Sequence, residues 1–153
     1  MRYLAVCLLF SVVCFPRHGM SETEEGRKGK GVEVAILCFS GRPVLRFALN
    51  REQEIRQLMT LVGKSEKIDD FKGESVLPAV LGYRGIEIEN PDKLFGFPWY
   101  LAVYKGAVET IDGQHLFYRD KEYMIEKFIV DLAYRKKMIS KDVRDMLLED
   151  ITE

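Results

Sequence analysis

The sequence has few of the residues that build redox, metal and nucleophilic centres. Among 153 residues there are three cysteines and two histidines, and no CxxC or HxxxH pair occurs. A classical zinc site needs several such ligands at short spacings, so we expect no metal ion and no other cofactor. The phosphate-binding pattern GxxxxGK[ST] and the nucleophile pattern GxSxG are also absent, and we assign no catalytic residue.

A strong net charge and a long apolar run are missing as well. The 23 Lys and Arg residues nearly balance 24 Asp and Glu residues, which argues against a nucleic acid as partner. No apolar run reaches the roughly 18 residues of a membrane-spanning helix. The apolar share of 47% and the charged share of 31% are ordinary for a folded globular chain.

The first 21 residues have the pattern of a secretory signal peptide. Arg2 precedes an uncharged apolar run over residues 3–15, and Gly19-Met20-Ser21 provides an exit of small residues. We therefore expect residues 1–21 to direct export to a periplasm, a cell envelope or the extracellular space. Contact with the membrane would then be transient, through this peptide alone. An uncleaved anchor and a first structural element of the fold are the alternatives.

The rest of the chain divides into a short linker and one domain. Residues 22–31 are polar, charged and rich in glycine, which is typical of a flexible linker. Residues 32–153 are long enough for one α+β domain. Cleavage would leave Cys38 as the last cysteine, so an internal disulfide is not expected. Cys38 lies in the apolar run AILCF, which predicts a buried thiol.

Hydrophobic periodicity predicts strands first and helices last. Alternation and apolar runs indicate strands, whereas apolar residues at i, i+3, i+4 and i+7 indicate helices. Asn50 and Ser140 are candidate helix N-caps, and Asp120 can cap a helix through about residue 137. The predicted elements are a hairpin at 32–40 and 44–49 with a turn at 40–43, a helix at 50–63, a strand at 83–89, a meander at 99–118, and helices at 120–137 and from 140.

The strand at 32–40 is apolar on both faces, so we expect helices on both faces of the sheet. The predicted fold class is α+β: a five- or six-stranded antiparallel sheet with the helix at 50–63 on one face and the two C-terminal helices on the other. The order β-β-α-β-β-β-α-α resembles the longin, roadblock and profilin-like group. This resemblance covers residues 32–150 and lies in element order alone, so it implies a fold but no activity.

The aromatic segment 94–100, with the sequence LFGFPWY, is the most unusual feature of the chain. Gly96 and Pro98 oppose regular structure, and connecting loops normally run over the surface. Exposed aromatic residues often mark interaction sites. An alternative is that these side chains lie beneath the sheet and complete the core. The predicted binding residues are Phe95, Phe97, Trp99 and Tyr100, with Arg84 as a flanking cation.

Three functions are compatible with these features. The first is an exported, non-catalytic module that binds a protein partner through the aromatic segment. The second is a binder of a small apolar ligand or lipid, in a pocket between that segment and the C-terminal helix. The third is a carboxylate-based enzyme, which requires that at least two acid–base groups converge in one cleft. Its candidate residues are Glu87, Glu89, Glu109 and His115.

Overall fold

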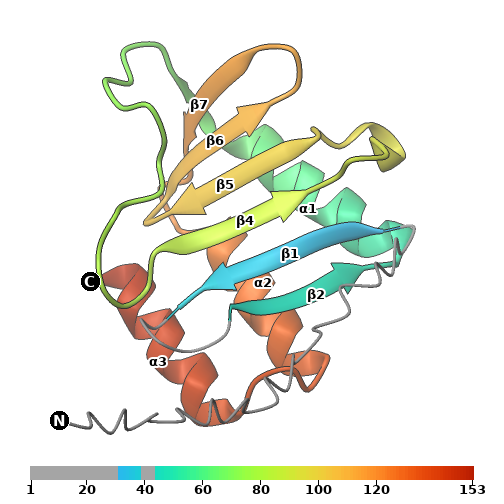
Figure 1. Ribbon diagram of the computed structural model, residues 1–153, viewed down its shortest axis with the longest axis vertical. Helices are drawn as coiled ribbons and strands as arrows, with labels where there is room; N and C mark the ends of the chain where they lie inside the picture. Colours follow the sequence, from blue (N-terminus) through green and yellow to red (C-terminus); the bar gives the residue numbers. More distant parts are fainter. Residues whose placement is uncertain (1–30, 39–43) are drawn as a thin grey trace, which may run out of the picture.

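A computed structural model, which describes residues 31–38 and 44–153, shows an α+β fold with a single antiparallel sheet (Figure 1). The predicted signal peptide, the linker before Gly31 and the turn at 40–43 lie outside the described residues. The strands are β1 (Val32–Leu37), β2 (Leu45–Leu49), β3 (Glu66–Ile68), β4 (Gly85–Glu89), β5 (Tyr100–Tyr104), β6 (Ala107–Ile111) and β7 (His115–Arg119). Their order across the sheet is β2-β1-β4-β5-β6-β7-β3.

In the part of the chain that the structure describes, the sheet has seven strands, not the predicted five or six. The strand that the sequence did not reveal is β3, which follows helix α1 (Glu52–Lys64) and pairs with β7 at the edge of the sheet. Its three residues, Glu66 to Ile68, are too few and too polar to show a period of two. Its pairing with the distant β7 was therefore visible only in the folded chain.

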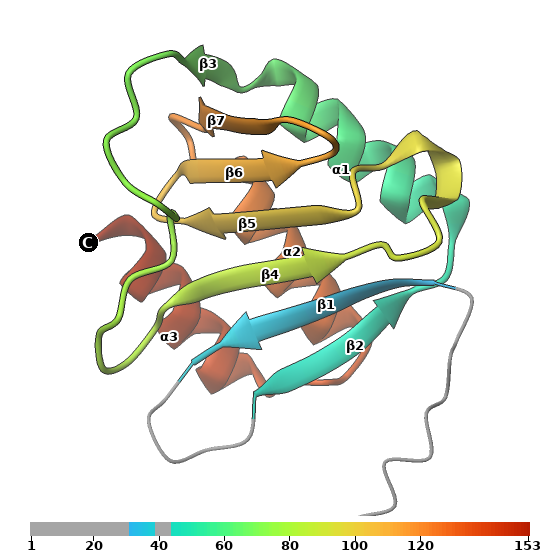
Figure 2. The same ribbon diagram turned by 45° about the horizontal axis from the view of Figure 1, so that its top comes forward.

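The three helices of the described residues lie on one face of the sheet, so the predicted placement on both faces is wrong. Helix α1, helix α2 (Met124–Arg135) and helix α3 (Lys141–Thr152) all run behind the strands in both ribbon views (Figure 1 and Figure 2). Helix α1 contacts α2, and α2 contacts α3, which places them in one layer. Within residues 31–38 and 44–153, the sheet consequently has one face that the helices cover and one face without a helix, which we call the helix-free face.

Irregular chain covers part of the helix-free face in place of a helix. We call residues 69–84 the β3–β4 loop. A Cβ atom on Gly85 would lie only 2.7 Å from a methyl carbon of Leu77, so the loop passes directly over the start of β4. On the same face of β1, Ala35 and Leu37 are buried. Strand β1 is therefore buried on both faces, as its apolar residues predict. On the helix-free face this burial involves the small side chain of Ala35 and the β3–β4 loop, and no helix of the described residues.

The core lies between the sheet and the helices. Alternate residues of β1, β4 and β5 point toward the helices and are buried, while the apolar stripes of the helices meet them. The fully buried members include Val34, Ile36, Ile86, Ile88, Leu101 and Val103 from the strands, and Ile55, Leu58, Ile125, Ile129, Leu147 and Ile151 from the helices. Among the described residues, no helix combines the length and the apolar character that crossing a membrane requires.

The start of α3 agrees with the sequence, whereas the starts of α1 and α2 differ. Ser140 caps α3 by accepting a hydrogen bond from the Val143 amide at 3.3 Å. Helix α2 begins at Met124 and not at residue 120, and its N-cap is Tyr123, so the predicted cap at Asp120 is wrong. Asp120 still accepts a hydrogen bond from the Ile125 amide at 2.7 Å, from outside the helix. The predicted N-cap at Asn50 is wrong, because α1 begins after Arg51 and no side chain caps it.

Candidate functional site

The predicted aromatic segment lies in a corner that joins β4 to β5. We call residues 90–99 the β4–β5 corner; it protrudes at one end of the sheet and contacts α1 (Figure 2). Its centre is the buried side chain of Asn90. The Asn90 amide nitrogen donates to the carbonyls of Leu94 at 3.2 Å and Phe97 at 2.9 Å, and its oxygen accepts from the Leu94 amide at 2.9 Å. One side chain thus satisfies three backbone groups of the corner.

The backbone of the corner is held in a conformation that side chains disfavour. Lys93 and Phe95 have φ angles of 48° and 56°, in the left-handed region. This conformation costs about 1–2 kcal/mol for a residue with a Cβ atom. Such residues persist where surrounding contacts fix them, and they often occur at functional sites. Here the contacts that fix them are the Asn90 hydrogen bonds and the packing of Phe97.

The corner divides its aromatic side chains between the core and the surface. Phe97 is 1% exposed and belongs to the hydrophobic core. Phe95 and Trp99 are 44% and 42% exposed. Tyr100, the first residue of β5, is half-buried beside Trp99, with ring centroids 5.7 Å apart. The residues that can reach a partner are therefore Phe95, Trp99 and Tyr100, whereas Phe97 holds the corner on the core.

Arg84 does not lie near the corner. Its backbone amide donates to Leu37 at 2.7 Å at the start of β4, whereas the Trp99 carbonyl accepts from Asn90 at the other end of that strand. At about 3.3 Å per residue, the length of β4 separates the two places by about 20 Å. The predicted grouping of Arg84 with the aromatic segment is thus wrong, because the two lie at opposite ends of one strand.

Tyr100 faces the helix-free side of the sheet among carboxylates. Its hydroxyl donates to Glu87 at 3.4 Å, and Glu89 is its direct neighbour on β4. Burial, and next the adjacent charge of Glu87, raise the pKa of the Tyr100 phenol. The phenol therefore remains a neutral hydrogen-bond donor at physiological pH.

Two of the candidate acid–base residues do meet on the helix-free face. Glu109 on β6 is buried, and its Oε1 atom lies 2.7 Å from Nε2 of His115 on β7. Its Oε2 atom accepts from the Ser75 hydroxyl at 2.7 Å and from the Val76 amide at 2.9 Å. Both carboxylate oxygens are thus engaged, and the hydrogen bonds join the β3–β4 loop to β6 and β7.

The geometry around Glu109 is that of a structural link. In a Ser–His–carboxylate arrangement the imidazole lies between the hydroxyl and the carboxylate. Here the carboxylate lies between Ser75 and His115. Glu87 lies two strands away across Ala102, about 10 Å from Glu109. Within the part of the chain that the structure describes, no three His, Cys, Asp or Glu residues could hold a metal ion.

A second buried carboxylate, Glu126 of α2, escaped the sequence reasoning. It accepts from the Tyr83 hydroxyl at 2.5 Å and from the backbone amides of Lys105 at 3.0 Å and Gly106 at 2.9 Å. Burial raises the pKa of Glu126, although these hydrogen bonds oppose the shift. The feature that could have indicated the burial of Glu126 is its position in a helix that is buried on most sides, one turn before Ile129 and Val130.

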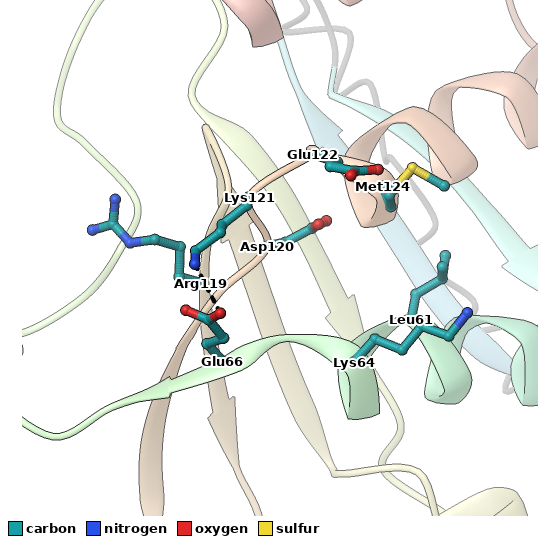
Figure 3. A pocket seen from close by; sticks show the side chains of 8 residues that line it. All are labelled: Leu61, Lys64, Glu66, Arg119, Asp120, Lys121, Glu122 and Met124. Carbon is teal, nitrogen blue, oxygen red and sulfur yellow. Dashed lines mark hydrogen bonds and ion pairs between the residues drawn. The ribbon is translucent and has the colours of Figure 1, made fainter.

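The cavity in Figure 3 lies away from the aromatic corner, between the end of α1 and the start of α2. It measures about 300 Å³, and six of its eight lining residues are charged. An ion pair between Lys121 and Glu66, at 2.8 Å, closes one side, while Lys64 and Arg119 point away from one another. This cavity is therefore not the apolar pocket predicted between the aromatic segment and the C-terminal helix. Its lining residues are Leu61, Lys64, Glu66, Arg119, Asp120, Lys121, Glu122 and Met124.

Comparisons of the chain with protein-family models, with curated proteins and with solved structures found no match. The resemblance to the longin, roadblock and profilin-like group therefore rests on element order alone. Because a shared fold does not determine function, the geometry of the described residues is the basis for assigning one.

Proposed function

We propose that the protein is an exported, non-catalytic module that binds a protein partner through the β4–β5 corner. The observation that carries this proposal is the exposure of Phe95 and Trp99 on a backbone fixed from within. Large aromatic side chains contribute much of the energy at protein interfaces. A corner that is already rigid loses little conformational entropy when it binds.

The cost of building the corner supports the same proposal. A corner that served only to connect β4 to β5 could have glycine at Lys93 and Phe95, because glycine adopts the left-handed conformation at little cost. The chain does have glycine at the neighbouring left-handed position, Gly96. Instead Phe95 occupies such a position, with much of its ring exposed to solvent. A partner that covers Phe95 and Trp99 would bury this exposed apolar surface. The free energy gained would offset the cost of the left-handed backbone.

Export and fold group belong to this proposal as well. Export is supported by the basic start and apolar run of residues 1–21. Placement in the longin, roadblock and profilin-like group is supported by the shared order of a strand pair, a helix, a meander and C-terminal helices. Placement in this group concerns the fold and implies no activity.

The test is affinity capture of partners from native envelope and secreted extract. The bait would be the purified protein, compared with a Phe95→Ser/Trp99→Ser variant. A matched control is Met124→Ser/Met138→Ser, because these side chains are 44% and 42% exposed at other places on the surface. Circular dichroism would establish that all three baits are folded.

We expect a protein that the wild type and the methionine control capture and that the corner variant loses. Binding of the isolated partner to the three baits, measured by calorimetry, should show the same order. A partner that binds the corner variant as well as the wild type would contradict the proposed surface. Failure of every bait to retain any protein specifically would contradict the proposed function.

A further inference from the structure

The two edges of the sheet differ in how they are protected against pairing with another chain. The β3 edge has three residues and carries two ion pairs, Glu66 with Lys121 and Lys67 with Asp69. Short, charged edges are a common defence against sheet extension. The β2 edge has the sequence LRFAL, with Arg46 as its one charge, and in the described structure β2 pairs with a strand on one side only. It is therefore the edge that can accept a further strand.

The side chains of β2 select one register for pairing with β2 of a second copy. Antiparallel neighbours point to the same face, so residues of the same face must lie opposite one another. A register centred on Phe47 pairs all five residues and places Arg46 opposite Ala48 of the second copy. A register centred on Arg46 would place two guanidinium groups opposite one another, which is destabilising.

The favoured register brings opposite charges together across the new boundary. Ala48 already lies opposite Glu33 of β1. Arg46 of the second copy would lie on the far side of Ala48, about 10 Å from Glu33 between Cα atoms. The two long side chains can meet above the small Ala48 methyl group, and the twofold symmetry creates this contact twice. Glu89, opposite Glu33 on β4, adds to the negative potential.

In a single copy of the chain, Arg46 and Glu33 are available for an ion pair with a second copy. Among the described residues, neither Arg46 nor Glu33 takes part in an ion pair. A cavity of about 450 Å³ at the β2 edge is lined by Glu33, Arg46, Phe47 and Ala48, which gives an incoming guanidinium room. On the helix-covered side, Phe47 is half-buried against the core and would meet Phe47 of the second copy.

We propose that the β2 edge binds a second copy of this chain, with Arg46 of each copy paired with Glu33 of the other. The two sheets then join into one continuous sheet with both helical layers on the same side. The proposal does not depend on the β4–β5 corner, which lies at the end of other strands. A corner variant should therefore dimerise like the wild type.

The test is sedimentation velocity of the full chain over a wide concentration range. The variants are Arg46→Glu, Glu33→Arg and the double exchange, with Arg119→Glu as control because Arg119 is an exposed arginine on β7, five strands from β2 in the sheet. We expect a wild-type dimer, a dissociation constant raised at least about tenfold in each single variant, and recovery in the double exchange. Arg119→Glu should match the wild type.

Hydrogen exchange shows which residues form the contact, and it distinguishes a variant that cannot dimerise from one that is misfolded. The amides of residues 45–49 should gain protection with concentration in the wild type and not in Arg46→Glu or the milder Arg46→Ala. A wild type that stays monomeric at every concentration would overturn the proposal. So would a dimer that both single variants leave intact, or one whose concentration-dependent protection lies outside β2.

Discussion

Two irregular segments flank β4, and they are fixed by different kinds of buried side chain. Before the strand, the β3–β4 loop is held by Glu109, which binds Ser75 and Val76. After the strand, the β4–β5 corner is held by the amide of Asn90. In both cases one buried side chain satisfies polar groups of a segment that forms no regular element. The difference is that Glu109 accepts both of its hydrogen bonds with the loop, whereas the Asn90 amide both donates and accepts.

The two segments also differ in what they leave exposed. The β3–β4 loop packs Phe71 on Phe117, with centroids 4.1 Å apart, and exposes Val80 and Leu81. The corner buries Phe97 completely and exposes aromatic rings. Aromatic residues are enriched at binding hot spots, whereas leucine and valine are under-represented. The comparison therefore favours the corner as the contact surface, and substitutions in the two segments test this difference.

The largest effect is expected at Phe97. Phe97→Ala should lower the free energy of unfolding by about 3–5 kcal/mol, because it leaves a cavity in the core beneath the corner. Urea denaturation followed by circular dichroism measures this loss. Phe71→Ala, in the other segment, should cost less, because Phe71 is only half-buried. Equal losses at the two positions would show that the corner is no better fixed than the loop.

Asn90→Ala is expected to have the next largest effect. It removes hydrogen bonds to Leu94 and Phe97 and leaves their backbone groups without partners, at a cost on the order of 2–3 kcal/mol. The matched control is Asn50→Ala, since the Asn50 side chain is exposed and caps no helix. Asn50→Ala should change stability by less than about 0.5 kcal/mol. A similar, small loss for Asn90→Ala would refute the role given to its amide.

The end of the β3–β4 loop should respond to pH through Glu126, to which Tyr83 donates. Burial raises the folded-state pKa of Glu126 above its ordinary value of 4.5. The linked stability is therefore complete below that ordinary value and is lost as pH rises through the raised pKa. Glu126→Gln should destabilise the protein by on the order of 1–3 kcal/mol near pH 4, because the amide accepts fewer hydrogen bonds.

The difference in stability between wild type and Glu126→Gln should shrink as pH rises toward neutrality. Thermal unfolding of both proteins at a series of pH values measures this difference and removes contributions from other groups. Asn90→Ala provides the contrast, since its effect should stay constant over the same range. A constant difference for Glu126→Gln as well would mean that its pKa is equal in the folded and unfolded states.

The smallest effect on stability is expected at Trp99. Trp99→Ala should change the free energy of unfolding by less than about 1 kcal/mol, because a large part of the ring already contacts solvent. Its effect on partner binding should be far larger, as expected for a hot-spot residue. Chemical denaturation and calorimetry of the same variant separate the two quantities. A large loss of stability would indicate that Trp99 serves the fold.

The parts that sequence reasoning predicted are those with a repeating local signal. Ile86 and Ile88 alternate with Glu87 and Glu89, and β4 places them on opposite faces as predicted. The helical stripes led by Ile55 and Ile125 are buried as predicted. For the candidate site, the aromatic composition of residues 94–100 indicated the unusual segment but could not tell Phe97 from Phe95. Which ring enters the core depends on the Asn90 hydrogen bonds and on the left-handed backbone at Lys93 and Phe95.

The sequence by itself determined the class of fold, the hairpin, the meander and the helices, because each depends on the periodicity of neighbouring residues. Only the tertiary structure decided that all helices share one face, that Glu109 and His115 meet, and that Arg84 lies far from Trp99. These outcomes depend on which strands become neighbours and on how loops satisfy buried polar groups. Such choices minimise the free energy of the whole chain, and no short stretch of sequence records them.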